Sequence, residues 1–259
     1  MENQQNQKQI EISKVDVTHD KISGRGGIYF VLRYIETISF YQRFEKFFNF
    51  LSGSAKGLSP LQFLKQIFGY FMDGSDMSMK SFDRRKQDEA YAALLENTPD
   101  EMASSHQIKR CFRKFILVGN WLFRKILLQL FIWRLHIEQP DIIELNHQRG
   151  AGEINHRAVK EFATKEQLPF ERLGMNRAYY YLMLISYFLQ VAYKYDVAAE
   201  LLPLTSYPTT FRRQLIDFAA KIVASGGEFI LKVTQLIYDH LNIRKIWELS
   251  GAPPPIPIT

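Results

Sequence analysis

The sequence predicts a mainly α-helical protein, with a helical N-terminal lobe followed by a smaller part that also holds β-strands. Apolar residues recur at helical spacing over long stretches, as between Leu61 and Phe71. Only two short segments, 141–145 and 229–234, favour β-strands. Since 46% of the 259 residues are apolar and 14% are aromatic, the chain can bury a substantial core.

The composition indicates the cellular compartment and the class of binding partner. A net charge of +6 favours a polyanionic partner. Cys111 is the single cysteine, which excludes an intrachain disulfide and a cysteine-rich zinc site and favours a reducing, cytoplasmic setting. The polar residues 1–20 are predicted to be a disordered tail. The apolar segment 178–193 is shorter than the roughly 18 residues that span a membrane, so we expect a buried helix and no membrane partner.

The N-terminal lobe is predicted from turn and capping residues. Ile22 to Gly27 favours a glycine-rich turn that leads into an aromatic, amphipathic segment ending near Phe50. Ser59 and Pro60 are typical of a helix start, and Gly74 of a helix stop. Residues 88–96 form a further short helix that ends before Pro99.

A basic segment follows, in which Ser104 and Ser105 cap a helix. No acidic residue occurs between His106 and Ile137. Two interpretations stay open: a surface that follows DNA phosphates, in a helix-turn-helix-like arrangement, or a solvated basic stripe over the core. The cations of this segment are Lys109, Arg110, Arg113, Lys114, Arg124, Lys125 and Arg134.

The C-terminal part is predicted to mix strands and helices. The expected elements are a buried strand at 141–145, a loop at 168–175, helices at 176–196 and 209–224, a strand at 229–234, a last helix through Trp247 and a proline-rich tail at 253–259. Ser225, Gly226 and Gly227 are expected to end the helix at 209–224. Arg212 and Arg213 on that helix are predicted to face DNA.

Residues 146–160 combine an ionic and an apolar helix face. Asn146, Arg149, Glu153 and Lys160 fall within an arc of about 60°, while Phe162 points to the core. A carboxylate between two cations suits a site that holds a metal ion near a phosphodiester, but a solvated charged face has the same pattern. Glycines at 150 and 152 predict that regular helix begins only near Glu153.

The spacing of Arg149, Glu153 and Lys160 resembles the Arg, Glu and Lys of the Tyr-Arg-Glu-Lys signature of bacterial insertion-sequence transposases, with Asn146 in the place of the tyrosine. Two blocks, 22–145 and 146–255, resemble this family over nearly the whole chain. Their shared motifs include Lys56-Gly57-Leu58, Phe71-Met72-Asp73-Gly74, Ser104-Ser105-His106, Leu168-Pro169-Phe170, Tyr207-Pro208-Thr209-Thr210 and Arg212-Arg213.

The resemblance implies an RNase H-like core whose Asp-Asp-Glu triad binds Mg²⁺ or Mn²⁺. Glu153 would be the third acid and a metal ligand, and Arg149 and Lys160 would position DNA phosphates. The region that carries both aspartates in the family is absent between Leu145 and Asn146, so the chain resembles an internally deleted transposase. We therefore expect an incomplete RNase H-like core, exposed apolar helix faces, and marginal stability or self-association.

These observations predict a DNA-binding DDE transposase family protein that is inactive alone. The alternatives are a regulator or inhibitor of transposition, a non-functional gene product, or an enzyme whose missing carboxylates come from another subunit. The expected partners are the terminal inverted repeats of the transposon and a second copy or an intact transposase, in the cytoplasm and on the nucleoid. The predicted regions are a tail at 1–20, a DNA-binding helical region at 21–135, the core remnant at 136–252 and a tail at 253–259.

Overall fold

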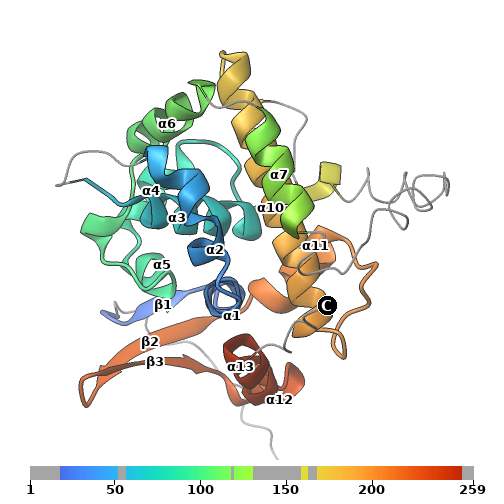
Figure 1. The fold of residues 1–259 in the computed structure, drawn as a ribbon. Helices are drawn as coiled ribbons and strands as arrows, with labels where there is room; N and C mark the ends of the chain where they lie inside the picture. The colour runs from blue at the N-terminus through green and yellow to red at the C-terminus, as the bar shows by residue number, and fades with distance from the viewer. Residues whose placement is uncertain (1–17, 52–56, 118–119, 131–158, 163–167, 253–259) are drawn as a thin grey trace, which may run out of the picture.

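The computed structural model describes residues 18–51, 57–117, 120–130, 159–162 and 168–252 (Figure 1). Within these ranges the protein is mainly helical, as predicted, with one antiparallel sheet of three strands. The helices are α1 (Ile28–Thr37), α2 (Phe40–Phe48), α3 (Pro60–Asp73), α4 (Ser81–Gln87), α5 (Glu89–Leu94), α6 (Ser105–Lys114), α7 (Asn120–Leu130), α10 (Leu173–Asp196), α11 (Pro208–Phe211), α12 (Gln235–His240) and α13 (Ile243–Gly251). The strands are β1 (Lys21–Ser23), β2 (Ala220–Ser225) and β3 (Glu228–Val233).

Helix α3 forms where the sequence predicts it. The Ser59 hydroxyl accepts a hydrogen bond from the Gln62 N–H, and the Gln62 side chain accepts one from the Ser59 N–H, so the first turn has a complete capping box. Pro60 occupies the first turn, and Gly74 ends the helix in a left-handed conformation with φ of 58°. Both predicted ends of this helix are confirmed.

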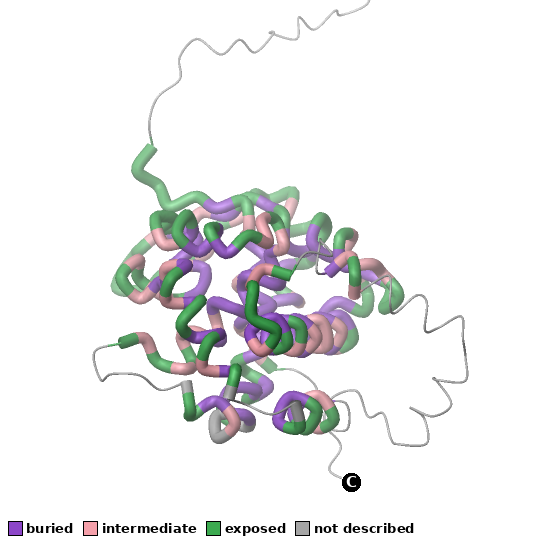
Figure 2. Tube along the Cα trace, turned by 90° about the horizontal axis from the view of Figure 1, so that it is seen from above, coloured by how far each residue is buried: buried purple, intermediate pink, exposed green. Residues whose placement is uncertain are grey.

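The centre of the core lies between α3 and α10. The rings of Phe71 and Tyr179 meet at 5.0 Å, and the buried hydroxyls of Tyr70 and Tyr179 lie 3.2 Å apart. Figure 2 shows the buried residues gathered inside the helical body, with exposed residues around it. Residues from α1 to α13 contribute to this one hydrophobic core. No helix of the described ranges is both long enough and apolar enough to cross a membrane.

The sheet joins the two ends of the described chain. Strand β1 pairs with β2, and β2 pairs with β3, both antiparallel, so the order is β1-β2-β3. The β2–β3 hairpin turns through Gly226 and Gly227, whose φ angles are 61° and 84°. In Figure 1 the sheet lies below the helical body, beside α12 and α13.

Two predictions at this sheet are wrong. The expected helix at 209–224 stops at Ile216, after α11 and one π-helical segment (Arg212–Ile216), and its last residues are strand β2. The glycine pair that looked like a helix stop is a hairpin turn, and the buried Ala220 and Ile222 alternate with half-buried residues. The expected turn at 22–27 begins as a strand, because Ile22 pairs with Lys221.

Two helix boundaries also differ from the prediction. Helix α10 begins at Leu173 instead of Asn176, because the Asn176 side chain bonds both the N–H and the carbonyl of Phe170 and holds the preceding loop against the first turn. The last helix is interrupted at Asn242, which has φ of 46° and accepts a hydrogen bond from the Lys245 N–H as the N-cap of α13. The strand predicted at 229–234 forms as β3, which begins and ends one residue earlier than predicted.

Several predictions fall outside the residues that the structure describes. They are the strand at 141–145, most of the signature segment 146–160, the boundary between residues 135 and 136, most of the tail at 1–20 and the whole tail at 253–259. The described parts on the two sides of that boundary share one core and one sheet.

Candidate nucleic-acid interface

Helix α6 is anchored at its N-terminus by side chains. Ser104 and Gln107 form a reciprocal capping box. The Asp83 carboxylate accepts a hydrogen bond from the Ser105 N–H at 2.8 Å, which fixes the start of α6 to α4. Hydrogen bonds from the Ser105 side chain and backbone lower the pKa of Asp83, so this carboxylate is charged at neutral pH. The helix therefore presents its faces in a defined orientation.

The two faces of α6 differ in chemistry. Ile108, Cys111 and Phe112 are buried against the core. The opposite face carries Lys109, Arg110 and Arg113, which are exposed, and Lys114 is half-buried. Within the described ranges, none of the three exposed cations forms an ion pair with a carboxylate. Burial raises the pKa of the Cys111 thiol to about 12, so this cysteine is a core residue and not a nucleophile.

Helix α7 extends the set of exposed cations. Arg124 and Lys125 are exposed on α7, whereas Arg134 lies outside the described residues. The ring of Phe123 stacks on Tyr181 of α10 at 5.0 Å and holds α7 to the core. Both α6 and α7 pack on α10, and α6 lies at the top of the molecule in Figure 1. Whether these helices enter a groove of DNA stays a prediction.

Arg212 is not where the sequence analysis expected it. Its side chain is buried, with 6% of the residue exposed, and faces the interior. The guanidinium donates hydrogen bonds to the carbonyls of Phe71 at 2.9 Å, Met72 at 3.1 Å and Phe162 at 3.0 Å. Burial lowers the pKa of Arg212 to about 10, so the group stays protonated at neutral pH. A DNA-facing role is therefore corrected to a role in the core, while the neighbouring Arg213 is exposed.

A charge cluster around the buried Asp73 and Arg85, beside Arg212, was not predicted from the sequence. Asp73, at the end of α3, forms ion pairs with Arg85 at 2.5 Å and with Arg25 at 3.2 Å, and Arg25 also pairs with Asp217. Three segments far apart in sequence meet here, so no local pattern could predict the contacts. Its two arginines, Arg25 and Arg85, form ion pairs with carboxylates. The cluster therefore holds the three segments together and does not offer free cations to DNA.

The signature segment is described only at its end. Residues 159–162 are helical, with Lys160 exposed and Phe162 fully buried, in agreement with the predicted ionic and apolar faces. The Phe162 ring stacks on Phe71 at 6.4 Å. Arg149 and Glu153 lie outside the described residues, so their predicted roles are untested.

A metal ion in this family would need several carboxylates close together. In the part of the chain that the structure describes, no group of three or more His, Cys, Asp or Glu side chains could hold a metal ion. Glu153, the one ligand that the resemblance assigns, lies outside these residues, so the Mg²⁺ or Mn²⁺ site stays a prediction. Comparison of the chain with protein-family models, with curated proteins and with solved structures gives no match.

Proposed function

We propose that the protein is a DNA-binding member of the DDE transposase family that occupies transposon ends without cutting them by itself. The observation that carries the DNA-binding part is the anchored helix α6, whose exposed Lys109, Arg110 and Arg113 form no ion pair with a carboxylate of the described ranges. The family part rests on the Arg149, Glu153 and Lys160 spacing and the further motifs of the two resembling blocks.

The charge on α6 suits the phosphate backbone for a physical reason. Each lysine or arginine that neutralises a phosphate releases condensed counterions, so affinity gains an entropic term that falls with salt. The three side chains lie on one helix whose other face is buried, so they present their charges together. Exposed Arg124, Lys125, Lys160 and Arg213 are further candidates for phosphate contacts.

Loss of the catalytic step follows from the missing aspartates. Strand cleavage in such enzymes uses two divalent ions, which activate the attacking oxygen and stabilise the leaving one. Glu153 alone cannot hold two ions, and the described residues supply no replacement cluster. On this proposal the RNase H-like core is incomplete, and the protein acts as a competitor or partner of an intact transposase at its DNA ends.

The test is salt-dependent binding of the purified chain to a duplex carrying the inverted repeats that flank its gene. Neutralising Lys109, Arg110 and Arg113 to Gln should weaken binding and reduce the slope of log K against log salt by about 2 to 3, since each phosphate contact contributes about 0.9. Fluorescence anisotropy at several salt concentrations measures both quantities.

The matched control neutralises three cations elsewhere, Lys221, Arg244 and Lys245, which changes the net charge equally. This control variant should retain the wild-type salt slope. Equal losses of affinity in the two variants would show that binding depends only on net charge, which would contradict an interface on α6. A wild-type chain that does not bind the duplex would contradict the proposal altogether.

The enzymatic alternative has its own test. Incubation of the same duplex with the protein and Mg²⁺ or Mn²⁺ should give no cleavage. Cleavage that disappears in Glu153→Gln would show that carboxylates from another subunit complete the site, and would replace the non-cutting proposal by an active transposase.

A further inference from the structure

The outer strand of the sheet, β3, combines exposed apolar residues with a free edge. Within the described ranges, β3 pairs with β2 on one side and with no strand on the other. Phe229 is 78% exposed and Ile230 is 40% exposed, although both lie in a regular strand. An apolar edge strand of this kind is a template for pairing with another strand, because its outward N–H and carbonyl groups lack partners.

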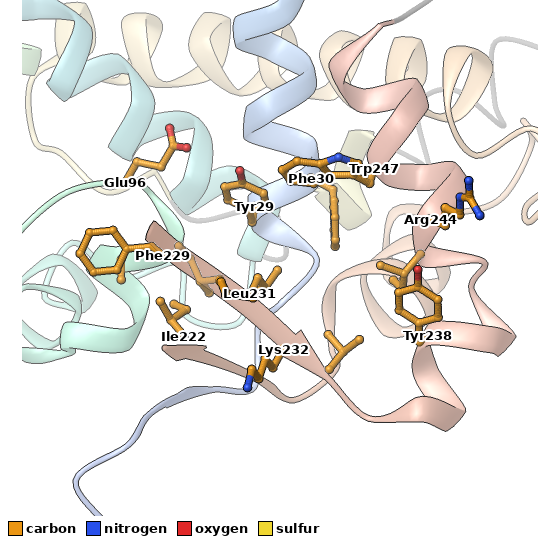
Figure 3. A pocket seen from close by; sticks show the side chains of 15 residues that line it. Tyr29, Phe30, Glu96, Ile222, Phe229, Leu231, Lys232, Tyr238, Arg244 and Trp247 are labelled. Atoms are coloured by element: carbon orange, nitrogen blue, oxygen red, sulfur yellow. The ribbon is translucent and has the colours of Figure 1, made fainter. Parts of the chain in front are cut away.

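The surroundings of β3 are also apolar and hollow. A cavity of about 560 Å³ lies between β3, α1, α12 and α13. Figure 3 shows Leu231 pointing from the strand towards Tyr29, with Trp247 on the neighbouring helix, whereas Lys232 points to the other side of the strand. Trp247 remains 44% exposed at this cavity.

The pairing within the hairpin assigns the two faces of β3. Residues that are directly opposite in an antiparallel pair share a face, and neighbours along a strand alternate. Leu231 lies opposite the buried Ile222, so Leu231 and Phe229 belong to the inner face. Glu228, Ile230 and Lys232 therefore belong to the outer face.

The outer face of β3 carries two charges, Glu228 and Lys232, which form no ion pair within the described part of the chain. Lys232 lies directly opposite Lys221, a like charge, and Lys221 is paired with Asp20 at 2.7 Å. Like charges in this position are unfavourable, so an acidic group on the open side of Lys232 would be favourable.

We propose that β3 pairs antiparallel with β3 of a second copy of this chain, about a two-fold axis at Ile230. A two-fold axis perpendicular to the sheet places one residue opposite itself, so residues whose numbers sum to twice that of the central residue face each other. With Ile230 at the centre, Glu228 of each copy lies opposite Lys232 of the other. The result is a continuous sheet through both copies, with two symmetric ion pairs.

Neighbouring registers lack this match. A centre at Leu231 places Lys232 opposite Ile230, and a centre at Phe229 places Glu228 opposite Ile230. A lone charge on an edge strand opposes pairing, but here the charges are opposite in sign and equally spaced about Ile230. Charge complementarity therefore favours a second copy of this chain as the partner of β3, and it favours the register centred on Ile230.

The same register also covers apolar surface on the inner face. Phe229 of each copy lies opposite Leu231 of the other, at the mouth of the cavity. Removal of two such aromatic side chains from water, together with the new backbone hydrogen bonds, supplies the favourable free energy of association.

The experiment is sedimentation velocity of the full chain over a wide range of concentration. The wild type should form a reversible dimer. Lys232→Glu and Glu228→Lys should each weaken it by about tenfold or more, because both ion pairs become repulsive. The double reversal, Glu228→Lys with Lys232→Glu, should restore the dimer to within about threefold of wild type, since opposite charges again face each other.

Lys80→Glu, an exposed charge reversal on another part of the surface, is the matched control and should leave the dimer unchanged. Circular dichroism of each variant confirms that it is folded. A wild type that stays monomeric at all concentrations would overturn the proposal. So would a dimer that resists both single reversals, or a double variant that fails to recover, because either result places the contact elsewhere or in another register.

Discussion

Helix α6 and the interior beside α10 both carry cations, but in opposite environments. Lys109, Arg110 and Arg113 of α6 are exposed. Arg212 and Lys194 are buried, with 6% and 2% of each residue exposed. Nothing in the sequence around these residues separates the buried cations from the exposed ones. The charge of a residue therefore does not predict whether its side chain lies on the surface or in the core.

The difference lies in the acceptors that surround the cations. The Lys194 ammonium donates hydrogen bonds to the carbonyls of Leu204 at 2.7 Å and Ser206 at 2.9 Å. Arg212 bonds the carbonyls of Phe71 and Met72, in the last turn of α3, where the helix dipole is negative. A buried cation is tolerated when carbonyls satisfy its donors, whereas the exposed cations of α6 form no ion pair with a carboxylate of the described residues.

Removal of the Arg212 guanidinium should have the largest effect on stability. Arg212→Gln should lower the free energy of unfolding by about 3 kcal/mol or more, because buried carbonyls lose their donors and a space opens beside Phe162. Urea unfolding followed by circular dichroism measures the change. Arg213→Gln, the exposed neighbour, is the control and should change stability by less than about 0.5 kcal/mol. Equal effects would contradict the distinction between the two arginines.

Lys194 should make stability depend on pH. Burial lowers the pKa of Lys194 from 10.5 to about 8 in the folded state. Between these two values the unfolded chain binds more protons than the folded chain, so the free energy of unfolding rises with pH, by up to about 3 kcal/mol across the window.

The measurement compares wild type with Lys194→Met in urea from neutral pH to about pH 10, the upper part of the window. Groups common to both proteins, such as Cys111, cancel in the difference. The stability of wild type relative to the variant should increase above pH 8. A difference that stays constant with pH would show that Lys194 is not buried as a cation.

Gly74→Ala tests the close contact between Gly74 and the Arg212 side chain. Gly74 has φ of 58°, and a Cβ there would lie 2.2 Å from the Arg212 Cζ. The substitution should cost about 1 to 2 kcal/mol and less in the Arg212→Gln background, because the clash is then relieved. Gly24→Ala, where a Cβ meets nothing within 4 Å, is the control. Purely additive costs in the double variant would contradict the contact.

The smallest expected effect is at the start of α6. Ser104→Ala removes one half of the capping box and should lower stability by about 1 kcal/mol. On the proposed function, DNA binding should weaken less than in the variant that lacks all three exposed cations. Thermal unfolding and anisotropy report the two effects, and a DNA-binding loss without a stability change would place Ser104 in direct contact with DNA.

Local signals account for what the sequence analysis predicted correctly. The caps Ser59 and Ser104 and the stop at Gly74 act within a few residues, so both ends of α3 and the start of α6 were predicted. The apolar run of α10 and the strand β3 were also recognised from periodicity. For the candidate site, both interpretations of the basic segment place Lys109, Arg110 and Arg113 at the surface, where they lie in the structure.

The sequence by itself therefore determined the helical class, the caps of α3 and α6 and the exposed cations of α6, because those features depend on neighbours along the chain. The β2–β3 hairpin is also a local feature, because Gly226 and Gly227 form its turn, although the two glycines were interpreted as a helix stop. Only the tertiary structure decided that β1 completes the sheet and that Arg212 is buried. Strand β1 pairs with β2, about 200 residues away, and Arg212 needs the Met72 carbonyl, 140 residues away. Partners so distant leave no local pattern, so their effects appear only when the chain is folded.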